Sequence, residues 1–599
     1  MIVPQTIKNK IPIVTPEMAY STRIKTVIFF NTALFLIVWS FWGNTISKDM
    51  GYSHVPTTNH LTASSILIPI VPAMDGPVVG QLSANSIPAK AGLRQGDVII
   101  GVNGVLVTSP EMANYLIRSG LQTKTLKLRV LRQMQHLNIS FQTDTSIRHK
   151  TLKVLSLPSS QQFIIMLVFL KLTIIMFFFI FKNIINRMII VMIFASLMML
   201  VGMVMRVYTP IDAFFSIKFN TISLLLGMGI ISITLDEAGV FDYIAIKMTE
   251  YGGGSYLKIL VLCCVLTYVL SLLVNNLTTI LVIVPMTLNL ALMNDIDPRP
   301  IIIGEIIASN LGGASTMVGD FPNMLISSET DVVFNEFIVY MMPICLVLLS
   351  VLLFYLHKLS SQRQMKMNFS GTVKKLKNFS NFTHRERRAV KRSVFVLFHV
   401  ILLFSLSERL SLKPSAIALL GAMSLFLFSG IKKQKIIQRV GFNDILFFVG
   451  LFIVVGGLEA SGLIHYASEF IRTISFSNKY ASCLLIMWIS ALVTAFLSAG
   501  PTTALLFPIA ISIQPIAGGH LIWWSLSLGV LAGSSSTLIG ATAGPVAASL
   551  LEKFSTMYGV TFNGDNTIRY NEFLKIGLPM MGAFLGISSL YMIWLCSRI

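Results

Sequence analysis

The stretch Ala308–Asn323, "ASNLGGASTMVGDFPN", holds three glycines, an aspartate, a proline and five hydroxyl or amide side chains. It lies in a chain of 599 residues of which 54% are hydrophobic and 12% charged, a composition typical of a polytopic membrane protein. Inside a bilayer, unwound backbone is tolerated only where it is buried in protein or lines a cavity that supplies hydrogen-bond partners. The stretch therefore predicts a broken membrane helix whose ends form a binding site.

Glycine and proline are the residues that such a break requires. We expect one break at Gly312 and Gly313 and another from Gly319 to Pro322. The side chains expected to add oxygen atoms there are Ser309, Asn310, Ser315, Thr316 and Asn323.

Apolar windows of about 17 to 22 residues, long enough to cross a hydrocarbon layer as helices, recur from Thr26 to Leu595. Residues 1–25 are basic and predict a cytoplasmic tail, and residues 26–43 predict an uncleaved transmembrane anchor. Between 358 and 392, eleven lysines and arginines accompany one glutamate and predict a cytoplasmic linker. Loops of this kind explain the net charge of +20, so nucleic acid is not an expected partner. We expect a multi-pass protein of a bacterial inner membrane, in contact with lipid.

Residues 44–160 are then periplasmic and contain short strand-like segments. The segment "PAKAGLRQGDVIIGVNGVLV", Pro88–Val107, resembles the centre of a bacterial-type PDZ domain covering about 62–145. The resemblance implies a short helix at Ala91–Leu93 and a carboxylate-binding loop near Asp75–Gly80. A peptide or protein segment is the implied partner. The alternative is a PDZ-like cap that binds no free peptide.

The remainder of the chain is duplicated, with one unit at 161–357 and another at 393–599. The corresponding residues are separated by 221 to 224 positions: Gly239 and Gly462, Asp236 and Glu459, Thr278 and Thr502, Gly319 and Gly540. Basic loops at Lys182–Arg187 and Lys432–Arg439 lie at non-equivalent places in the two units. This charge pattern predicts repeats of inverted topology, provided that the "NNLTT" segment forms a re-entrant hairpin.

The segments "NNLTTILVIVP" and "EIIASNLGGASTMVGDFPN" resemble the signature of the ion transporter superfamily. The nearest branch holds sodium/proton antiporters, arsenite-efflux membrane subunits and the melanosomal P protein, with citrate and dicarboxylate carriers as more distant relatives. The resemblance covers about 160–599. It implies two inverted repeats, each with a re-entrant hairpin and a broken helix, elevator-like movement and a homodimer. The fold class expected is an all-α polytopic membrane protein with a small strand-rich PDZ-like domain.

The resemblance also implies the residues of the transport site. In the first repeat they are Asn275, Asn276, Thr278, Thr279, Ser309, Asn310, Thr316, Asp320 and Asn323. In the second repeat they are Thr502, Thr503, Ser535, Ser536 and Thr537, with helix breaks at Gly533 and Gly540.

The second repeat departs from this pattern at its amide and acid positions. Asn275 and Asn276 correspond to Ala499 and Gly500. Asp320 corresponds to Ala541, and Asn323 corresponds to Gly544. We therefore expect one cation or proton site, built by the first repeat.

Carboxylates inside a membrane are costly and usually functional, so Asp320 is the expected coupling acid for Na⁺ or H⁺. A helix-capping role for Asp320 is the alternative. Four further acids are candidates for a proton path: Asp236, Glu237, Glu305 and Glu459. No catalytic residue, cofactor or metal is expected apart from a transported or coupling ion.

Other functional classes fit less well. An intramembrane zinc protease requires H-E-x-x-H, which none of the nine histidines forms, so we do not expect an enzyme. The five cysteines match neither a metal site nor a disulfide framework. Acids and amides without arginine in the motifs favour sodium/proton exchange. Two alternatives remain open, namely an ion-coupled carrier of a small anion or arsenite, and a PDZ-bearing sensor derived from a transporter.

Overall fold

The computed structural model describes residues 70–73, 76–79, 91–94, 96–102, 105–106, 125–132, 135–142, 160–182, 185–241, 256–294, 296–360, 384–410, 412–431, 433–560 and 565–598. The chain forms two compact units, a smaller one at Thr32–Ser159 and a larger one that includes Ser160–Ile599. The expected tail and anchor at 1–43 and most of the linker at 358–392 lie outside the described residues.

The smaller unit contains an antiparallel sheet with the strand order β1-β2-β3-β5-β6, and β4 pairs with β3. Along β5, Leu128 and Val130 are buried whereas Lys127 and Arg129 are exposed, as expected for a sheet with one face on a core. The strands are β1 (Ile70–Ala73), β2 (Gly76–Val79), β3 (Val98–Val102), β4 (Val105–Leu106), β5 (Thr125–Arg132) and β6 (Gln135–Gln142).

Two details of the PDZ resemblance differ from the structure. Gly76–Val79 is strand β2, paired with β1, where the carboxylate-binding loop was expected. Ala91 and Gly92 form a turn and not a short helix. Gly96 adopts φ +90° directly before Asp97 and β3, so the expected turn into a strand is present.

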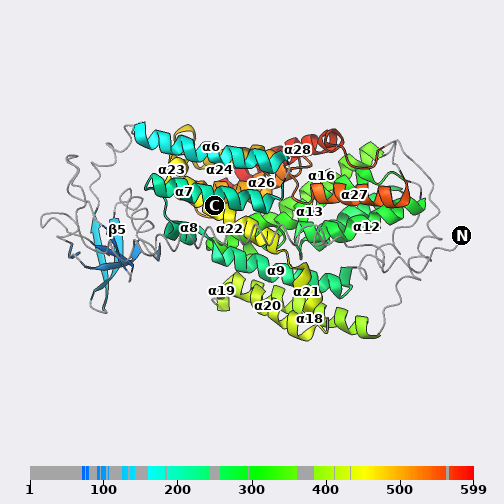
Figure 1. The fold of residues 1–599 in the computed structure, drawn as a ribbon, viewed down its shortest axis with the longest axis horizontal. Helices are drawn as coiled ribbons and strands as arrows, with labels where there is room; N and C mark the ends of the chain where they lie inside the picture. Colours follow the sequence, from blue (N-terminus) through cyan, green and yellow to red (C-terminus); the bar gives the residue numbers. More distant parts are fainter. Residues whose placement is uncertain are drawn as a thin grey trace. The chain divides into compact units, whose positions relative to one another are not determined.

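The larger unit is a helical bundle (Figure 1). The helices of its first half are α6 (Ser160–Lys182), α7 (Arg187–Val204), α8 (Pro210–Ser216), α9 (Phe219–Glu237), α11 (Tyr256–Ser271), α12 (Asn276–Asn294), α13 (Arg299–Ser315), α14 (Phe321–Glu329), α15 (Phe334–Glu336), the π-helical turn η1 (Phe337–Met341) and α16 (Met342–Ser360). Those of its second half are α18 (His384–Ser405), α19 (Ser407–Leu410), α20 (Pro414–Phe428), α21 (Lys433–Arg439), α22 (Phe442–Ala460), α23 (Leu463–Ile474), α24 (Lys479–Leu497), α25 (Ala499–Ala517), α26 (Leu521–Ser534), α27 (Gly544–Tyr558) and α28 (Tyr570–Arg598). Within the described residues, eight helical segments are long and apolar enough to cross a membrane.

The two halves pack reciprocally. Helix α9 of the first half contacts α20, and the corresponding helix α22 of the second half contacts α7. Both crossings are close at equivalent glycines: Gly227 lies against the backbone of Ala418, and Gly450 lies against Val191 and Met192. In the same way α12 contacts α27 while α25 contacts α14. This exchange is the pattern that a pseudo-two-fold axis between repeats produces.

Each half contains a helical hairpin. Helix α11 ends at Ser271, α12 begins at Asn276, and the two helices pack against each other. In the second half the chain turns at Ser498, with φ +68°, between the packed helices α24 and α25. The structure thus has the hairpin expected at "NNLTT" and the second hairpin that the family resemblance implies.

The broken helix of the first half is interrupted from Thr316 to Asp320, between α13 and α14, and Pro322 lies in the first turn of α14. The expected break at Gly312 and Gly313 is absent, because α13 continues through both residues to Ser315. Gly312 lies against the backbone carbonyl of Tyr268 in α11, where a side chain would not fit. The glycine pair therefore permits close helix packing and does not unwind the chain.

In the second half, α26 likewise continues through Gly533 to Ser534, so Gly533 does not break the helix. Gly533 lies against the backbone carbonyl of Ala491 in α24 and has the same packing role as Gly312. Gly540 lies in the interruption between α26 and α27, as expected.

Candidate ion-binding site

A chain of buried hydrogen bonds connects the first hairpin to both broken helices. Ser271 Oγ donates to Asn276 Oδ1 at 2.7 Å, and Asn276 Nδ2 donates to Asn310 Oδ1 at 3.2 Å. Asn310 Nδ2 then donates to the carbonyl oxygen of Ser534 at the end of α26, at 3.1 Å. Each amide uses both its donor and its acceptor groups, so the network fixes the orientation of these side chains.

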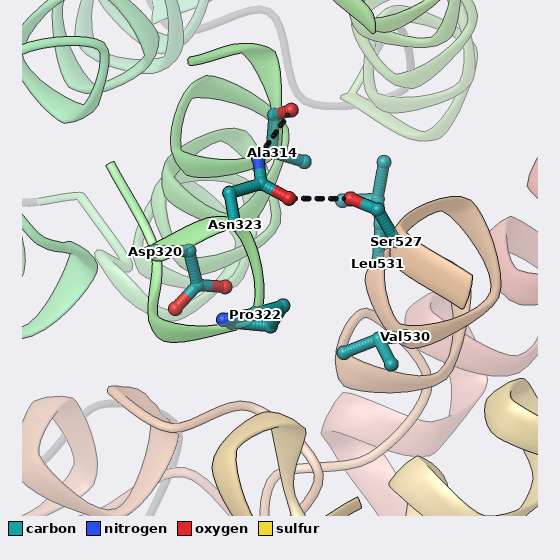
Figure 2. A pocket seen from close by; sticks show the side chains of 7 residues that line it. All are labelled: Ala314, Asp320, Pro322, Asn323, Ser527, Val530 and Leu531. Atoms are coloured by element: carbon teal, nitrogen blue, oxygen red, sulfur yellow. Dashed lines mark hydrogen bonds between the residues drawn. The ribbon is translucent and has the colours of Figure 1, made fainter. Parts of the chain in front are cut away.

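Asn323 forms a second link between the halves. Its Nδ2 donates to the carbonyl oxygens of Ala314 at 2.9 Å and Thr316 at 2.8 Å, and so satisfies the free end of α13. Its Oδ1 accepts a hydrogen bond from Ser527 Oγ of α26 at 2.7 Å. Figure 2 shows Asn323 between Ala314 and Ser527. Asp320 and Pro322 lie on the same side of the pocket as Asn323, opposite Ser527 and Val530.

Asp320 is the N-cap residue of α14, and its Oδ1 accepts the backbone amide of Phe321 at 2.9 Å. Asp320 forms no ion pair with any described residue. Gly313 lies next to both Asn276 and Asp320, since a Cβ atom there would meet Asn276 Oδ1 and Asp320 Cβ. Asp320 therefore caps α14 and has no ion-pair partner among the described residues.

The pocket beside Asp320 is small and has no room for a water molecule. The described residues of its lining include Asp320 and no lysine or arginine: Ala314, Asp320, Pro322, Asn323, Ser527, Val530 and Leu531. Ala314, in the last turn of α13, and Leu531, in the last turn of α26, belong to the lining, and the C-terminal turns of helices carry partial negative charge. The N-terminus of α14 has the opposite sign, but it is capped by the Asp320 carboxylate. The local charge favours a cation.

The other predicted residues of the first repeat support the backbone around the network. Asn275 Oδ1 caps α12 by accepting the Thr278 amide at 2.8 Å, and Thr279 Oγ1 donates to the carbonyl oxygen of Asn275. Thr316 Oγ1 donates to the carbonyl oxygen of Leu272, which joins the helix break to the hairpin tip. The carbonyl oxygen of Ser309 lies 2.8 Å from Ser271 Oγ, so it shares the single hydroxyl proton of Ser271 with Asn276 Oδ1.

The hydroxyl groups predicted in the second repeat bond within that repeat. The donors and their carbonyl acceptors are Thr503 to Ala499, Ser535 to Leu531, Ser536 to Gly533, and Thr537 to Ala495. Thr502 Oγ1 is buried and has no hydrogen-bond partner among the described residues. Among the described residues, the second repeat contributes Ser527 and the Ser534 carbonyl to the network of the first repeat.

The four acids proposed for a proton path lie apart from the pocket. Asp236 and Glu237, at the end of α9, form ion pairs with Arg439 of α21 at 2.6 and 2.7 Å. Glu459 is exposed at the end of α22. Glu305 is fully buried in α13, where Thr287 Oγ1 donates to its Oε1, and its Oε2 has no partner among the described residues. None of the four lines the pocket at Asp320.

Sequence reasoning missed Ser271 and Ser527. A signal for Ser527 exists, because it lies seven residues, or two helical turns, before Ser534 in the apolar segment "WWSLSLGVLAGS". Ser271 directly precedes the hairpin tip, and only its contact with Asn276 distinguishes it from other serines in apolar helices.

The transport helices carry the match to a family model. Residues 165–529, from α6 to α26, match the model of the citrate transporter family, CitMHS. The chain belongs to the CitMHS family. The matched region includes the hairpin tip, both ends of the α13–α14 break and Ser527, and it leaves the smaller unit outside.

Curated proteins that are similar in sequence to this chain support its assignment to the family. The magnetosome protein MamN of Magnetospirillum gryphiswaldense is 34% identical over 409 residues, which are 66% of this chain and 92% of MamN. An uncharacterized transporter of Mycobacterium bovis is 30% identical over 400 residues, 65% of this chain and 90% of that protein. The P protein of Mus musculus is 28% identical over 447 residues, 61% of this chain and 52% of the P protein. The expected relationship to the P-protein branch of the ion transporter superfamily is confirmed, and the chain is a secondary transporter of the CitMHS family.

Proposed function

We propose that this CitMHS-family transporter exchanges Na⁺ or Li⁺ for protons, with Asp320 as the acid that binds them alternately. The observation that carries the proposal is Asp320 itself, an acid without a cationic partner among the described residues, at a helix break lined by amide and hydroxyl groups. A carboxylate in this position is neutralised either by a proton or by a bound cation, and competition between the two is the physical basis of antiport.

The charge of the pocket supports a cation as cargo. A tricarboxylate requires cationic groups to bind its negative charge, whereas the described residues that line the pocket include an acid and no lysine or arginine. A dehydrated monovalent cation requires only a few oxygen ligands. Asp320, Asn323 and Ser527 lie around the pocket and can supply them.

An anion carrier is the second candidate, and one feature favours it. The helices α12 and α14 both begin at the site, and helix N-termini bind anions. In α14 that N-terminus is already capped by Asp320, so an anion would compete with a fixed carboxylate. We propose the cation exchanger for this reason.

Measurement of proton movement in everted membrane vesicles distinguishes the cation exchanger from the anion carrier. We expect proton release after addition of Na⁺ or Li⁺ and none after citrate, succinate or arsenite. A response to an anion alone would move the assignment to the anion carrier. The absence of proton movement with every ion would favour a transporter-derived sensor, in which the smaller unit would bind the ligand.

We further propose that the membrane is a bacterial inner membrane and that the smaller unit is periplasmic. The basic segments at 1–25 and 358–392 support this orientation. Access by an elevator-like movement and assembly as a homodimer remain proposals that rest on the family resemblance.

A further inference from the structure

An aromatic stack lies beside Asp320. Phe321, the residue after Asp320, is stacked on Phe448 of α22 with ring centroids 3.8 Å apart and an interplanar angle of 7°. Phe452, one turn further along α22, lies 6.5 Å from Phe321. The Phe321 ring is buried, and Phe448 is half-buried.

The stack depends on the glycine at position 500. A Cβ atom at Gly500 would lie 2.8 Å from Phe448 Cε1 and 3.0 Å from its Cζ, too close for the ring to keep its place. The same Cβ would lie 3.8 Å from Phe321 Cδ1. Gly500 is in the first turn of α25, at the tip of the second hairpin.

Comparison of the two repeats shows that a small residue and a large residue have changed places between the hairpin tip and the facing helix. Gly500 corresponds to Asn276, and Phe448 corresponds to Leu225 of α9. In the first repeat the larger group is therefore on the hairpin tip, where Asn276 holds Asn310. In the second repeat the tip residue has no side chain, and the facing helix carries a larger one that occupies the space.

From this geometry we infer that Phe448, seated on Gly500 and stacked on Phe321, fills the second half-site and seals the Asp320 pocket on that side. The remaining hydroxyl groups of the second half-site agree with this role, because those that are paired bond to nearby backbone carbonyls of their own repeat. The transporter then binds its ion on one half of a two-fold frame. Phe448 is a positioning residue that excludes water and does not itself contact the ion.

The inference rests on the proposed function for the identity of the ion, but the seal can be tested without transport. The probe is a cysteine at Val530, which lines the Asp320 pocket, treated with a small cationic methanethiosulfonate reagent. The five natural cysteines are all buried, and the unsubstituted protein gives the background reaction. We expect V530C to react at least ten times faster when combined with Phe448→Ala.

Phe442→Ala is the control. Phe442 is an exposed phenylalanine in the first turn of the same helix, and among the described residues it has no ring contact with Phe321 or Phe448. V530C combined with Phe442→Ala should react at the rate of V530C alone. Phe448→Tyr keeps the stacked ring and should also leave the rate unchanged. If Phe448→Ala does not fold, Phe448→Leu provides a smaller opening with the same expected direction.

A double-mutant cycle tests the shared space independently. Gly500→Asn restores the amide of the first repeat, but it should lower the Tm while Phe448 is present. Phe448→Ala should recover part of that loss, which gives coupling between the two positions. Equal V530C reaction rates with and without Phe448, or strictly additive effects in the cycle, would overturn the inference. If Phe448→Ala accelerates the V530C reaction as expected but no ion drives proton release, the role of Phe448 is supported and the proposed cation/proton exchange is rejected.

Discussion

Ser527 Oγ donates to Asn323 Oδ1 at 2.7 Å across 204 residues of sequence, and both side chains are buried. This bond joins α26 of the second half to α14 of the first half, directly beside the Asp320 pocket. The asymmetry of the site follows from such contacts. The second half supplies single groups to a network that the first half organises.

Ser527→Ala leaves Asn323 Oδ1 buried without its donor, which costs about 1–3 kcal/mol. We expect a lower Tm and weaker Na⁺ or Li⁺ activation of proton release. Ser525→Ala is the control, because Ser525 lies on the same helix and its buried Oγ has no partner among the described residues. Equal losses in both variants would contradict a specific role for the Ser527 bond.

Asn276→Ala and Asn275→Ala should separate the network from the helix cap. Asn276 links Ser271 to Asn310, so its loss should abolish exchange. Asn275 caps α12, and its loss should cost about 1 kcal/mol of stability while exchange is retained. Vesicle assays and thermal unfolding of the same preparations distinguish the two effects. An active Asn276→Ala variant would remove the network from the mechanism.

Gly313→Ala should weaken ion binding at the Asp320 site without adding or removing a polar group. The added methyl group would meet Asn276 Oδ1 and displace it, with an overpacking cost of about 1–3 kcal/mol. Gly582→Ala in α28 adds the same group where, among the described residues, no atom outside the neighbouring turns of α28 lies within 4 Å, and it should be silent. Comparison of ion affinity in the two variants checks the prediction, and similar affinities would argue against close packing at Gly313.

The smaller unit should lose stability in acid through Asp97. Burial opposes ionisation of Asp97, but bonds from Arg132 and the Arg94 amide outweigh it and hold its pKa below the ordinary value. Because its pKa is lowered in the folded state, Asp97 stabilises the unit at pH values above its unfolded-state pKa of about 3.9. This stabilisation is lost as the pH falls through the pKa of Asp97 in the folded state.

Hydrogen exchange of β3 and β5 in the whole protein can measure this effect. Asp97→Asn should expose both strands at neutral pH and reduce their acid response. Arg129→Gln, an exposed change on β5, is the control and should match the natural protein. Unchanged protection in Asp97→Asn would show that the ion pair does not stabilise the sheet.

Much of this architecture could be predicted from the sequence, because apolar windows, charge bias and the internal repeat are local or periodic signals. The break before Asp320 was predicted from its glycine and proline residues, and both hairpins were implied by the family resemblance. The break at Gly312 was not predicted correctly, because glycine permits both unwinding and close packing, and only the neighbouring carbonyl of Tyr268 decides between them. The pairing of Ser527 with Asn323 and of Phe448 with Phe321 depends on contacts between the halves, which a single sequence does not specify.

The most direct measurement compares Asp320→Asn with the natural protein in everted vesicles, with Glu552→Gln, an exposed change on α27, as the matched control. The account predicts that Na⁺ or Li⁺ releases protons from vesicles of the natural protein and of Glu552→Gln, and that Asp320→Asn abolishes this release at equal protein levels. Full exchange by Asp320→Asn would contradict the assignment of Asp320 as the coupling acid.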